Sequence, residues 1–275
     1  HASSSAASDV YKRQDEIVKA FVEKASSNGI DVFRTFDALN DFSNIELSIK
    51  EVKKNGKHAQ GAMAYTVSPV HSMNSWLDLA KQIEDAGADS VAIKDMAGLL
   101  KPNAAFELVS NLKENISVPI HMQTHATTGF STATNMKAIE AGIDNIDTSI
   151  SSMSMTYGHT ATETIVSMFD DTNLFSDIDK NLFPELSTHF KKIRKKYELF
   201  EGSLKGIDAS MLINQVPGGM LSNLESQLRE MDADDKFEDV LNEIPRVRQD
   251  LGFVPLVTPS SQIVGAQALF NVLDN

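Results

Sequence analysis

Short apolar runs alternate with amphipathic segments along most of this chain. Strands are predicted where apolar residues cluster, at residues 31–36, 60–66, 90–93, 118–123 and 145–150. Helices are predicted where apolar residues recur at helical spacing, at residues 44–55, 73–86, 102–114, 132–141 and 161–169. Because successive strands start roughly thirty residues apart, each strand and its following helix have the length of a βα unit.

Glycines mark the ends of three segments that precede a predicted strand. They are Gly29, Gly87 and Gly142, and glycine is the residue that most easily adopts the left-handed conformation after a helix. Five strands joined by crossover helices predict a parallel sheet. The pattern alone leaves two architectures open, a doubly wound sheet and part of a (β/α)8 barrel.

Polar residues near the end of every predicted strand favour the barrel. They are Arg34, Asp37 and Asn40; Ser68 and His71; Lys94 and Asp95; Gln123, His125 and Thr127; and Asp147, Ser151 and Ser152. A ring of polar groups at the carboxyl ends of the strands is typical of a barrel mouth, and no glycine-rich nucleotide loop follows any strand. We therefore predict an α/β fold, a (β/α)8 TIM barrel with about five βα units, whose interior includes side chains such as Phe33 and Ile93.

The two ends of the chain differ from this βα pattern. Toward the C-terminus, helices are predicted at 183–197 and 221–231, and the acidic residues 232–235 are expected to form a solvated loop. At the N-terminus, a stretch rich in Ser and Ala precedes the first helix, for which Asp15 is the predicted N-cap. We therefore divide the chain into three parts: a disordered or foreign tail at 1–14, a partial barrel at 15–200 and a helical extension at 201–275.

Composition narrows the class of protein. The chain has 275 residues, of which 41% are hydrophobic, and its formal net charge is −13. An acidic chain binds nucleic acid and anionic lipid poorly, so neither is expected as a partner. The sequence has no cysteines, no apolar run long enough to span a membrane and no signal-peptide pattern. These features predict a cytoplasmic protein.

Lys94 is the first candidate for chemistry. It follows the apolar strand residues Val91, Ala92 and Ile93, and a lysine there would be costly to bury without a partner. A lysine at the carboxyl end of a strand can form a Schiff base, bind a phosphate or, once carbamylated, ligate a metal. The alternative is an ordinary surface lysine beside a turn.

His121, Gln123 and His125 form the pattern most typical of metal ligands. Residues two apart on a strand face the same way, so these side chains share one face even if His125 lies just past the strand end. The spacing predicts a metal role for His125 and leaves His121 as a weaker candidate. The alternative is that one of these histidines is a core residue with its hydrogen bonds satisfied.

Several motifs in this order resemble the carboxyltransferase domain of biotin-dependent enzymes, which include the oxaloacetate decarboxylase α subunit, pyruvate carboxylase and the transcarboxylase 5S subunit. They are Phe33-Arg-Thr-Phe-Asp-Ala-Leu-Asn40, Lys94-Asp-Met-Ala-Gly98, Gln123-Thr-His-Ala-Thr-Thr-Gly129, Asp147-Thr-Ser-Ile-Ser-Ser-Met-Ser154, Asn214-Gln-Val-Pro-Gly-Gly-Met220 and Val257-Thr-Pro-Ser-Ser-Gln-Ile-Val-Gly265. The segments 126–129 and 151–163 resemble the decarboxylase α subunit most closely.

The resemblance implies a divalent metal (Zn, Mn or Co) bound by an Asp, a carbamylated lysine and two histidines. Lys94 matches the lysine and His125 the second histidine, whereas Gln123 stands where the family usually has the first histidine. An amide oxygen is a weaker zinc ligand than imidazole, so His121 is the residue expected to compensate. Thr258 matches the threonine that shuttles a proton between biotin and the pyruvate enolate. Candidates for substrate or biotin binding are Arg34, Asp37, Asp95, Thr127 and Ser151.

The function implied by the resemblance is the carboxyltransferase half-reaction of an oxaloacetate decarboxylase, a lyase. The carboxyl group of oxaloacetate would pass to biotin on a separate carrier domain and leave pyruvate. One alternative is a pyruvate carboxylase, which runs the same half-reaction in the other direction, and another is a catalytically dead fragment. The resemblance further implies a homo-oligomer and, for a decarboxylase, membrane subunits as partners that would hold the protein at the membrane periphery.

The same resemblance implies parts of the family domain that this chain lacks. In the family, three further strands come first and carry the metal-binding Asp and the arginine that holds the substrate carboxylate. What precedes Asp15 here is the Ser/Ala stretch, so we expect that stretch to be foreign and the fragment to be inactive alone. No biotin-accepting Met-Lys-Met motif occurs in the chain.

Overall fold

The computed structural model describes residues 2–175, 177–202, 206–209 and 211–274, with side chains described from residue 14 onward. Its core is one parallel sheet of five strands: β1 (Val32–Phe36), β2 (His58–Ala64), β3 (Ser90–Asp95), β4 (Ile120–Thr124) and β5 (Asn145–Ile146). All five strands were predicted, but β5 is shorter than expected. The backbone N–H of Asp147 still donates to the carbonyl oxygen of Met122, after which the chain leaves β4 and Ser149 forms an isolated bridge with Ala161.

The order of the strands distinguishes between the two architectures. The strands lie side by side in chain order, and each pairs in parallel with the next. A doubly wound sheet reverses its strand order at a switch point, whereas strands of a (β/α)8 barrel follow one another around the ring. The sheet is therefore a segment of a barrel, as predicted.

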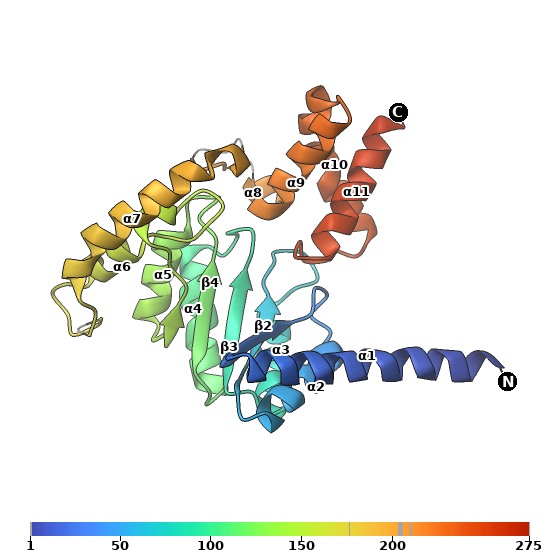
Figure 1. The fold of residues 1–275 in the computed structure, drawn as a ribbon, viewed down its shortest axis with the longest axis horizontal. Coiled ribbons are helices and arrows are strands. Elements are labelled where there is room, and N and C mark those ends of the chain that lie inside the picture. Colours follow the sequence, from blue (N-terminus) through green and yellow to red (C-terminus); the bar gives the residue numbers. More distant parts are fainter. Residues whose placement is uncertain (1, 176, 203–205, 210, 275) are drawn as a thin grey trace.

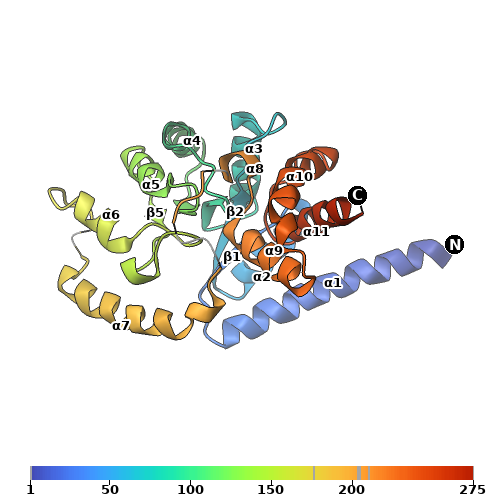
Figure 2. The ribbon, with the colours of Figure 1, turned by 90° about the horizontal axis from the view of Figure 1, so that it is seen from above.

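The crossover helices cover the outer face of the sheet. They are α2 (Ser43–Lys54), α3 (Met73–Asp85), α4 (Pro102–Asn115), α5 (Ser131–Glu140) and α6 (Thr162–Met168), and Figure 2 shows them curving around the strands. Ser72 caps α3 through a capping box with Ser75, and Pro102 occupies the first turn of α4. The predicted helix-end glycines Gly29, Gly87 and Gly142 all have left-handed φ angles, between 87° and 97°.

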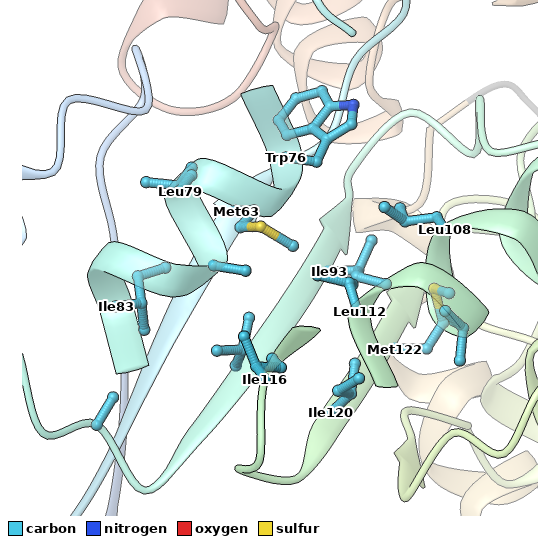
Figure 3. Packing of buried hydrophobic residues seen from close by; sticks show 14 of the residues in the cluster. Met63, Trp76, Leu79, Ile83, Ile93, Leu108, Leu112, Ile116, Ile120 and Met122 are labelled. Atoms are coloured by element: carbon cyan, nitrogen blue, oxygen red, sulfur yellow. The ribbon is translucent and has the colours of Figure 1, made fainter. Parts of the chain in front are cut away.

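The main hydrophobic core lies between the sheet and helices α2 to α5. Met63, Ile93 and Met122 point from neighbouring strands toward Ile83 of α3 and Leu112 of α4 (Figure 3). Phe33 belongs to the same buried cluster. The expectation that Phe33 and Ile93 fill the barrel interior is therefore wrong.

The interior face of the sheet carries the alternate residues. Apart from Phe36, these are small or polar: Arg34, Gln60, Ala62, Ala92, Lys94, His121 and Gln123. Because side chains alternate along a strand, the apolar residues between them must face the helices. The inward face of each strand can be assigned only once it is known that Lys94, His121 and Gln123 face the barrel interior.

The first helix, α1 (Ala2–Ser27), begins earlier than predicted. Asp15 lies within this helix, so its assignment as an N-cap is wrong. Val22 is buried against the main core, whereas Ile17 and Phe21 on the same helix are two-thirds exposed. In the part of α1 whose side chains are described, one edge of the helix therefore contacts the main core.

The C-terminal part of the chain is helical, as predicted. It contains α7 (Phe183–Lys196), α8 (Met211–Asn214), α9 (Gly218–Glu230), α10 (Phe237–Asp250) and α11 (Ser260–Leu273). Single-turn 3-10 helices in the described residues are η1 (Ser151–Met153), η2 (Lys180–Leu182), η3 (Glu198–Phe200) and η4 (Asp234–Lys236). Helices α8 to α11 share a second hydrophobic core. Figure 1 shows these helices beyond the arrowheads of the strands, at the carboxyl end of the sheet. The periodic pattern predicts neither α10 nor α11.

Arg248 of α10 joins the C-terminal helices to the barrel. Its buried guanidinium donates to Thr66 Oγ1 (2.8 Å) and to the carbonyl oxygen of Val67 (3.3 Å), just after β2. It also donates to Gln215 Oε1 (2.7 Å) and to the carbonyl oxygen of Val254 (2.8 Å). Burial lowers the pKa of Arg248 to about 10. The acceptors are all neutral, so this charge is stabilised by hydrogen bonds alone.

No helix in the part of the chain that the structure describes is long and apolar enough to cross a membrane.

Candidate functional site

Lys94, Gln123 and His125 meet at the carboxyl end of β3 and β4. Lys94 and Gln123 are register partners on neighbouring strands, and the Nζ atom of Lys94 donates to Gln123 Oε1 over 3.2 Å. The Nε2 atom of Gln123 lies 3.4 Å from Nε2 of His125. The three residues that the sequence singled out as metal ligands are therefore brought together.

The tautomer of His125 follows from its contacts. Its Nδ1 atom lies 2.7 Å from the carbonyl oxygen of Tyr157, and a carbonyl oxygen only accepts, so Nδ1 carries the hydrogen. Burial, followed by the nearby His159, lowers the pKa of His125 to about 4. The neutral ring therefore keeps a lone pair on Nε2, and this atom accepts from the Gln123 amide.

Lys94 has no carboxylate partner among the described residues, and it lies half-buried. Its Nζ atom lies 4.9 Å from the centre of the Phe36 ring. Burial, followed by the charge of Arg34, lowers the pKa of Lys94. At a given pH, a larger fraction of Lys94 is therefore in the uncharged amine form than for a surface lysine.

A second polar group lies one layer deeper in the barrel interior. Arg34 donates to Asp147 Oδ2 over 2.6 Å and to Gln60 Oε1 over 2.5 Å. His121 contacts the same carboxylate, with 2.5 Å between its Nε2 and Asp147 Oδ1. Burial raises the pKa of Asp147, but the hydrogen bonds from His121 and Arg34 outweigh it and hold the pKa well below its ordinary value.

His121 therefore belongs to the deeper group and not to the group around Lys94. Its Nε2 atom faces Asp147 and also lies 3.1 Å from Nη2 of Arg34. Its Nδ1 atom lies 3.4 Å from the Gln60 amide. With both ring nitrogens engaged, His121 is poorly placed to compensate for the missing imidazole at position 123.

Asp95 is buried in the wall of the site. Its carboxylate accepts from the backbone N–H groups of Leu99 (2.8 Å) and Leu100 (3.0 Å) and from Thr124 Oγ1 (2.8 Å). Burial, the largest influence, raises the pKa of Asp95 to about 6. This side chain holds the turn after β3 and thereby fixes the position of Lys94.

The other predicted substrate-binding residues occupy separate places. Asp37 accepts from the backbone of Leu39 and Asp41 and from Asn44, ahead of and within the first turn of α2. Thr127 is buried and donates to the carbonyl oxygen of Thr156. Ser151 is exposed and contacts Ser187 on α7. Of the five candidates, Arg34 alone lines the barrel interior beneath Lys94.

Thr258 lies on the segment that leads into α11 and is exposed. The preceding residue, Val257, is buried with Ala38 and Ala64, against Phe36. Ala64 is the register partner of Lys94, and Phe36 is the ring beneath its amine. The helical extension therefore brings Thr258 to the neighbourhood of Lys94.

His159 and Tyr157 belong to the site as well, although no sequence pattern assigns them a role in it. The Nδ1 atom of His159 lies 3.0 Å from the carbonyl oxygen of Thr124, and the ring centre lies 4.7 Å from that of His125. Both residues lie in an irregular loop whose neighbours Met155 and Thr156 have left-handed φ angles. The loop has no periodic pattern that could have predicted its contact with β4.

Donors other than carboxylates dominate the site. Among the residues described, no group of three or more His, Cys, Asp or Glu side chains could hold a metal ion. The donors on offer are Lys94, Gln123 and His125, and His125 meets the main requirement, a neutral imidazole oriented through its other nitrogen. The residues therefore fit a metal ion whose ligands include the lysine, with at least one more ligand needed.

Comparison with protein families matches two models to this chain. The model described as HMGL-like matches residues 10–189, and the conserved carboxylase domain model PYC_OADA matches residues 211–275. The chain belongs to the HMGL-like family. The first match runs from within α1 to within α7, and the second covers the helices α8 to α11 at the carboxyl end of the sheet. The two family regions therefore meet near Lys94, where Val257 packs with Ala64.

Two curated relatives place this family member more narrowly. A pyruvate carboxylase subunit of Methanocaldococcus jannaschii is 53% identical over 260 residues, which cover 94% of this chain and 46% of the relative. The methylmalonyl-CoA carboxyltransferase 5S subunit of Propionibacterium freudenreichii subsp. shermanii is 50% identical, with coverage of 94% and 52%. The chain thus spans about half the length of these relatives.

Solved structures agree with this placement. The carboxyl transferase domain of Rhizobium etli pyruvate carboxylase, solved with pyruvate and biocytin, has a TM-score of 0.92 and 34% sequence identity. The match covers 94% of this chain and 45% of that chain. The resemblance to the carboxyltransferase domain is therefore confirmed, and the parallel sheet with its helical extension corresponds to part of the TIM-barrel fold of those domains.

Proposed function

We propose that this chain carries the carboxyltransferase half-reaction of a biotin-dependent enzyme, with oxaloacetate and pyruvate as its keto acids. The observation that carries the proposal is the convergence of Lys94, Gln123 and His125 beneath the segment that bears Thr258. The relatives named as pyruvate carboxylase and the Rhizobium etli domain solved with pyruvate and biocytin support the choice of substrates.

In this proposal Lys94 and His125 hold a divalent metal (Zn, Mn or Co), Lys94 in its carbamylated form. The lowered pKa of Lys94 supports carbamylation, since the uncharged amine is the form that reacts with carbon dioxide. The hydrogen bond from Nδ1 to Tyr157 leaves Nε2 of His125 as a donor atom. A bound metal would supply Lewis-acid polarisation of the keto oxygen.

The chain's own residues would then manage the proton and the carboxyl group. In the decarboxylating direction, the bond between the carboxyl group and the carbon beside the ketone breaks, and its electrons remain on the pyruvate enolate. The carboxyl carbon bonds to a biotin nitrogen, which loses its proton. Thr258 relays this proton to the enolate carbon, giving pyruvate.

The other predicted binding residues take supporting roles in the proposal. Arg34 lines the interior and adds positive charge below the keto acid, although Asp147 balances most of it. Asp95 and Thr127 hold the walls through their backbone partners, and Asp37 and Ser151 anchor the surrounding loops.

We propose the decarboxylating direction of the half-reaction first and the carboxylating direction second. The segments 126–129 and 157–159 favour an oxaloacetate decarboxylase. The specific observation in favour of pyruvate carboxylation is that relatives from several organisms carry the name pyruvate carboxylase. Biotin on a separate carrier domain and assembly into a homo-oligomer belong to both versions. A cytoplasmic location also belongs to both versions, whereas membrane subunits as partners and a place at the membrane periphery belong to the decarboxylase version alone.

A chimera provides the test. Residues 10–275 would replace the matching segment of the Methanocaldococcus jannaschii relative, and pyruvate formation from oxaloacetate would be followed with lactate dehydrogenase. Free biotin should raise the rate in the chimera, and Lys94→Ala should abolish the biotin-dependent part while Lys101→Ala, a change at an exposed lysine ahead of α4, should leave it intact. Biotin-dependent turnover that survives Lys94→Ala would contradict the proposal.

A further inference from the structure

We propose that His159 supplies the second imidazole of the metal site, the role that Gln123 does not fill. The inference rests on the proposed metal site at Lys94 and His125 and adds a residue from a different loop. Its starting point is the pair of histidine rings, whose centres lie 4.7 Å apart with an angle of 49° between their planes.

Both rings are oriented in the way that metal-binding histidines are. Nδ1 of His125 donates to the carbonyl oxygen of Tyr157 over 2.7 Å, and Nδ1 of His159 donates to that of Thr124 over 3.0 Å. A backbone carbonyl on one ring nitrogen fixes the tautomer and leaves the other nitrogen with its lone pair. Nε2 of His159 has no hydrogen-bond partner among the described residues.

The distance between the rings fits a shared ion. With metal–nitrogen bonds of about 2.0–2.1 Å, two imidazoles on one ion have ring centres about 5 Å apart. The observed separation of 4.7 Å is close to this value. The tilt between the planes also argues against simple face-to-face stacking.

Gln123 is unsuited to the same role in the observed arrangement. Its amide oxygen accepts from Lys94, and its amide nitrogen, which has no lone pair to offer, faces Nε2 of His125. The deeper residue His121 is held by Asp147 and Arg34. His159 is therefore the remaining imidazole beside His125.

Cobalt titration of the full chain tests the inference, because Co²⁺ reports its ligands through visible absorption without any need for activity. His159→Asn keeps an amide hydrogen that can reach the carbonyl oxygen of Thr124 but removes the donor at the Nε2 position. We expect this variant to bind Co²⁺ at least about 10-fold more weakly, with a changed spectrum. His159→Gln, which keeps donor atoms near the Nε2 position, should retain more affinity than His159→Asn.

The matched control is His189→Asn, at a histidine on α7 that contacts Phe190 and lies outside the site. It should leave Co²⁺ affinity unchanged, and thermal melting without metal should show that the variants remain folded. If His159→Asn binds like the unmodified chain while Lys94→Met and His125→Asn lose the ion, the inference is wrong and the proposed site stands. If the unmodified chain binds no Co²⁺, both are overturned.

Discussion

The ring nitrogen Nδ1 of His125 donates to the carbonyl oxygen of Tyr157 over 2.7 Å, and the ring of Tyr157 packs directly on Gly218 at the start of α9. A Cβ atom on Gly218 would collide with Cδ1 of Tyr157 and lie 3.1 Å from its Cβ. The imidazole at the centre of the proposed site is therefore positioned by the helices that cover the barrel. This contact explains why a glycine is required at residue 218.

Gly218→Ala should therefore destabilise the protein, whereas Gly219→Ala should not. A Cβ on Gly219 would meet no atom within 4 Å, and alanine favours the helix. We expect Gly218→Ala to lower the free energy of unfolding by roughly 1–3 kcal/mol, as overpacking does. Urea denaturation measures both changes.

The double variant provides a control. Adding Tyr157→Ala should remove the collision, so the double variant should lose less stability than the sum of the two single changes. Equal stability of the two glycine variants would argue against the contact.

The pKa of His125 provides a second prediction. In metal-free protein its ring protons should titrate near pH 4 rather than near 6.5, as followed by NMR. Because the pKa is lower in the folded state, protonation of this residue favours the unfolded chain. Its contribution to the free energy of unfolding is therefore fully present above pH 6.5, and roughly 3 kcal/mol of it is lost as the pH falls toward 4.

The pKa of Asp95 changes stability in the opposite direction over nearly the same pH range. Its folded pKa of about 6 lies above the ordinary value, so the folded state gains stability as the pH falls from 6 toward 3.8. The overall acid denaturation curve therefore mixes the two effects. The difference between the unmodified chain and His125→Asn isolates the histidine, and a His125 ring that titrates near 6.5 would contradict its burial.

The strands of the sheet and part of the candidate site follow from local sequence pattern. The βα alternation predicted every strand of the sheet, because each apolar run needs a covered face. The positions of Lys94 and His125 at strand ends predicted that they would lie close together, since the ends of neighbouring parallel strands are adjacent. The two-residue spacing predicted that Gln123 and His125 share a face. These relationships depend on residues close in sequence or on one regular element.

The parts that were missed depend on tertiary contacts. Which face of a buried strand points inward cannot be read from an unbroken apolar run, so Phe33 and Ile93 were assigned to the wrong side. Helix α10 contains Pro245, which breaks the local helical signal. His159 reaches the site through an irregular loop, and Asp147, which binds His121, lies just after the short strand β5.

Arg248 should be the main connection between the covering helices and the barrel. Arg248→Met removes hydrogen bonds to buried Thr66 and to two partly buried acceptors, Gln215 and the carbonyl oxygen of Val254. We expect a loss of roughly 2–4 kcal/mol and faster hydrogen exchange in α10 and α11, with β3 and β4 less affected. Arg246→Met, on the same helix but bonded to Glu243 and Asp250 at the surface, is the control and should change little. Similar exchange in both variants would show that Arg248 does not connect the two parts.

The central claim is that the site around Lys94 transfers a carboxyl group to biotin with Thr258 as the proton relay. The most direct measurement is the biotin-dependent rate of pyruvate formation in the chimera with Thr258→Ala, with metal content determined on the same samples. We expect a rate about 10²–10⁴-fold lower, unchanged metal content, and substantial activity in Thr258→Ser and in the surface control Thr172→Ala. A Thr258→Ala chimera that transfers the carboxyl group at the unmodified rate would contradict this claim.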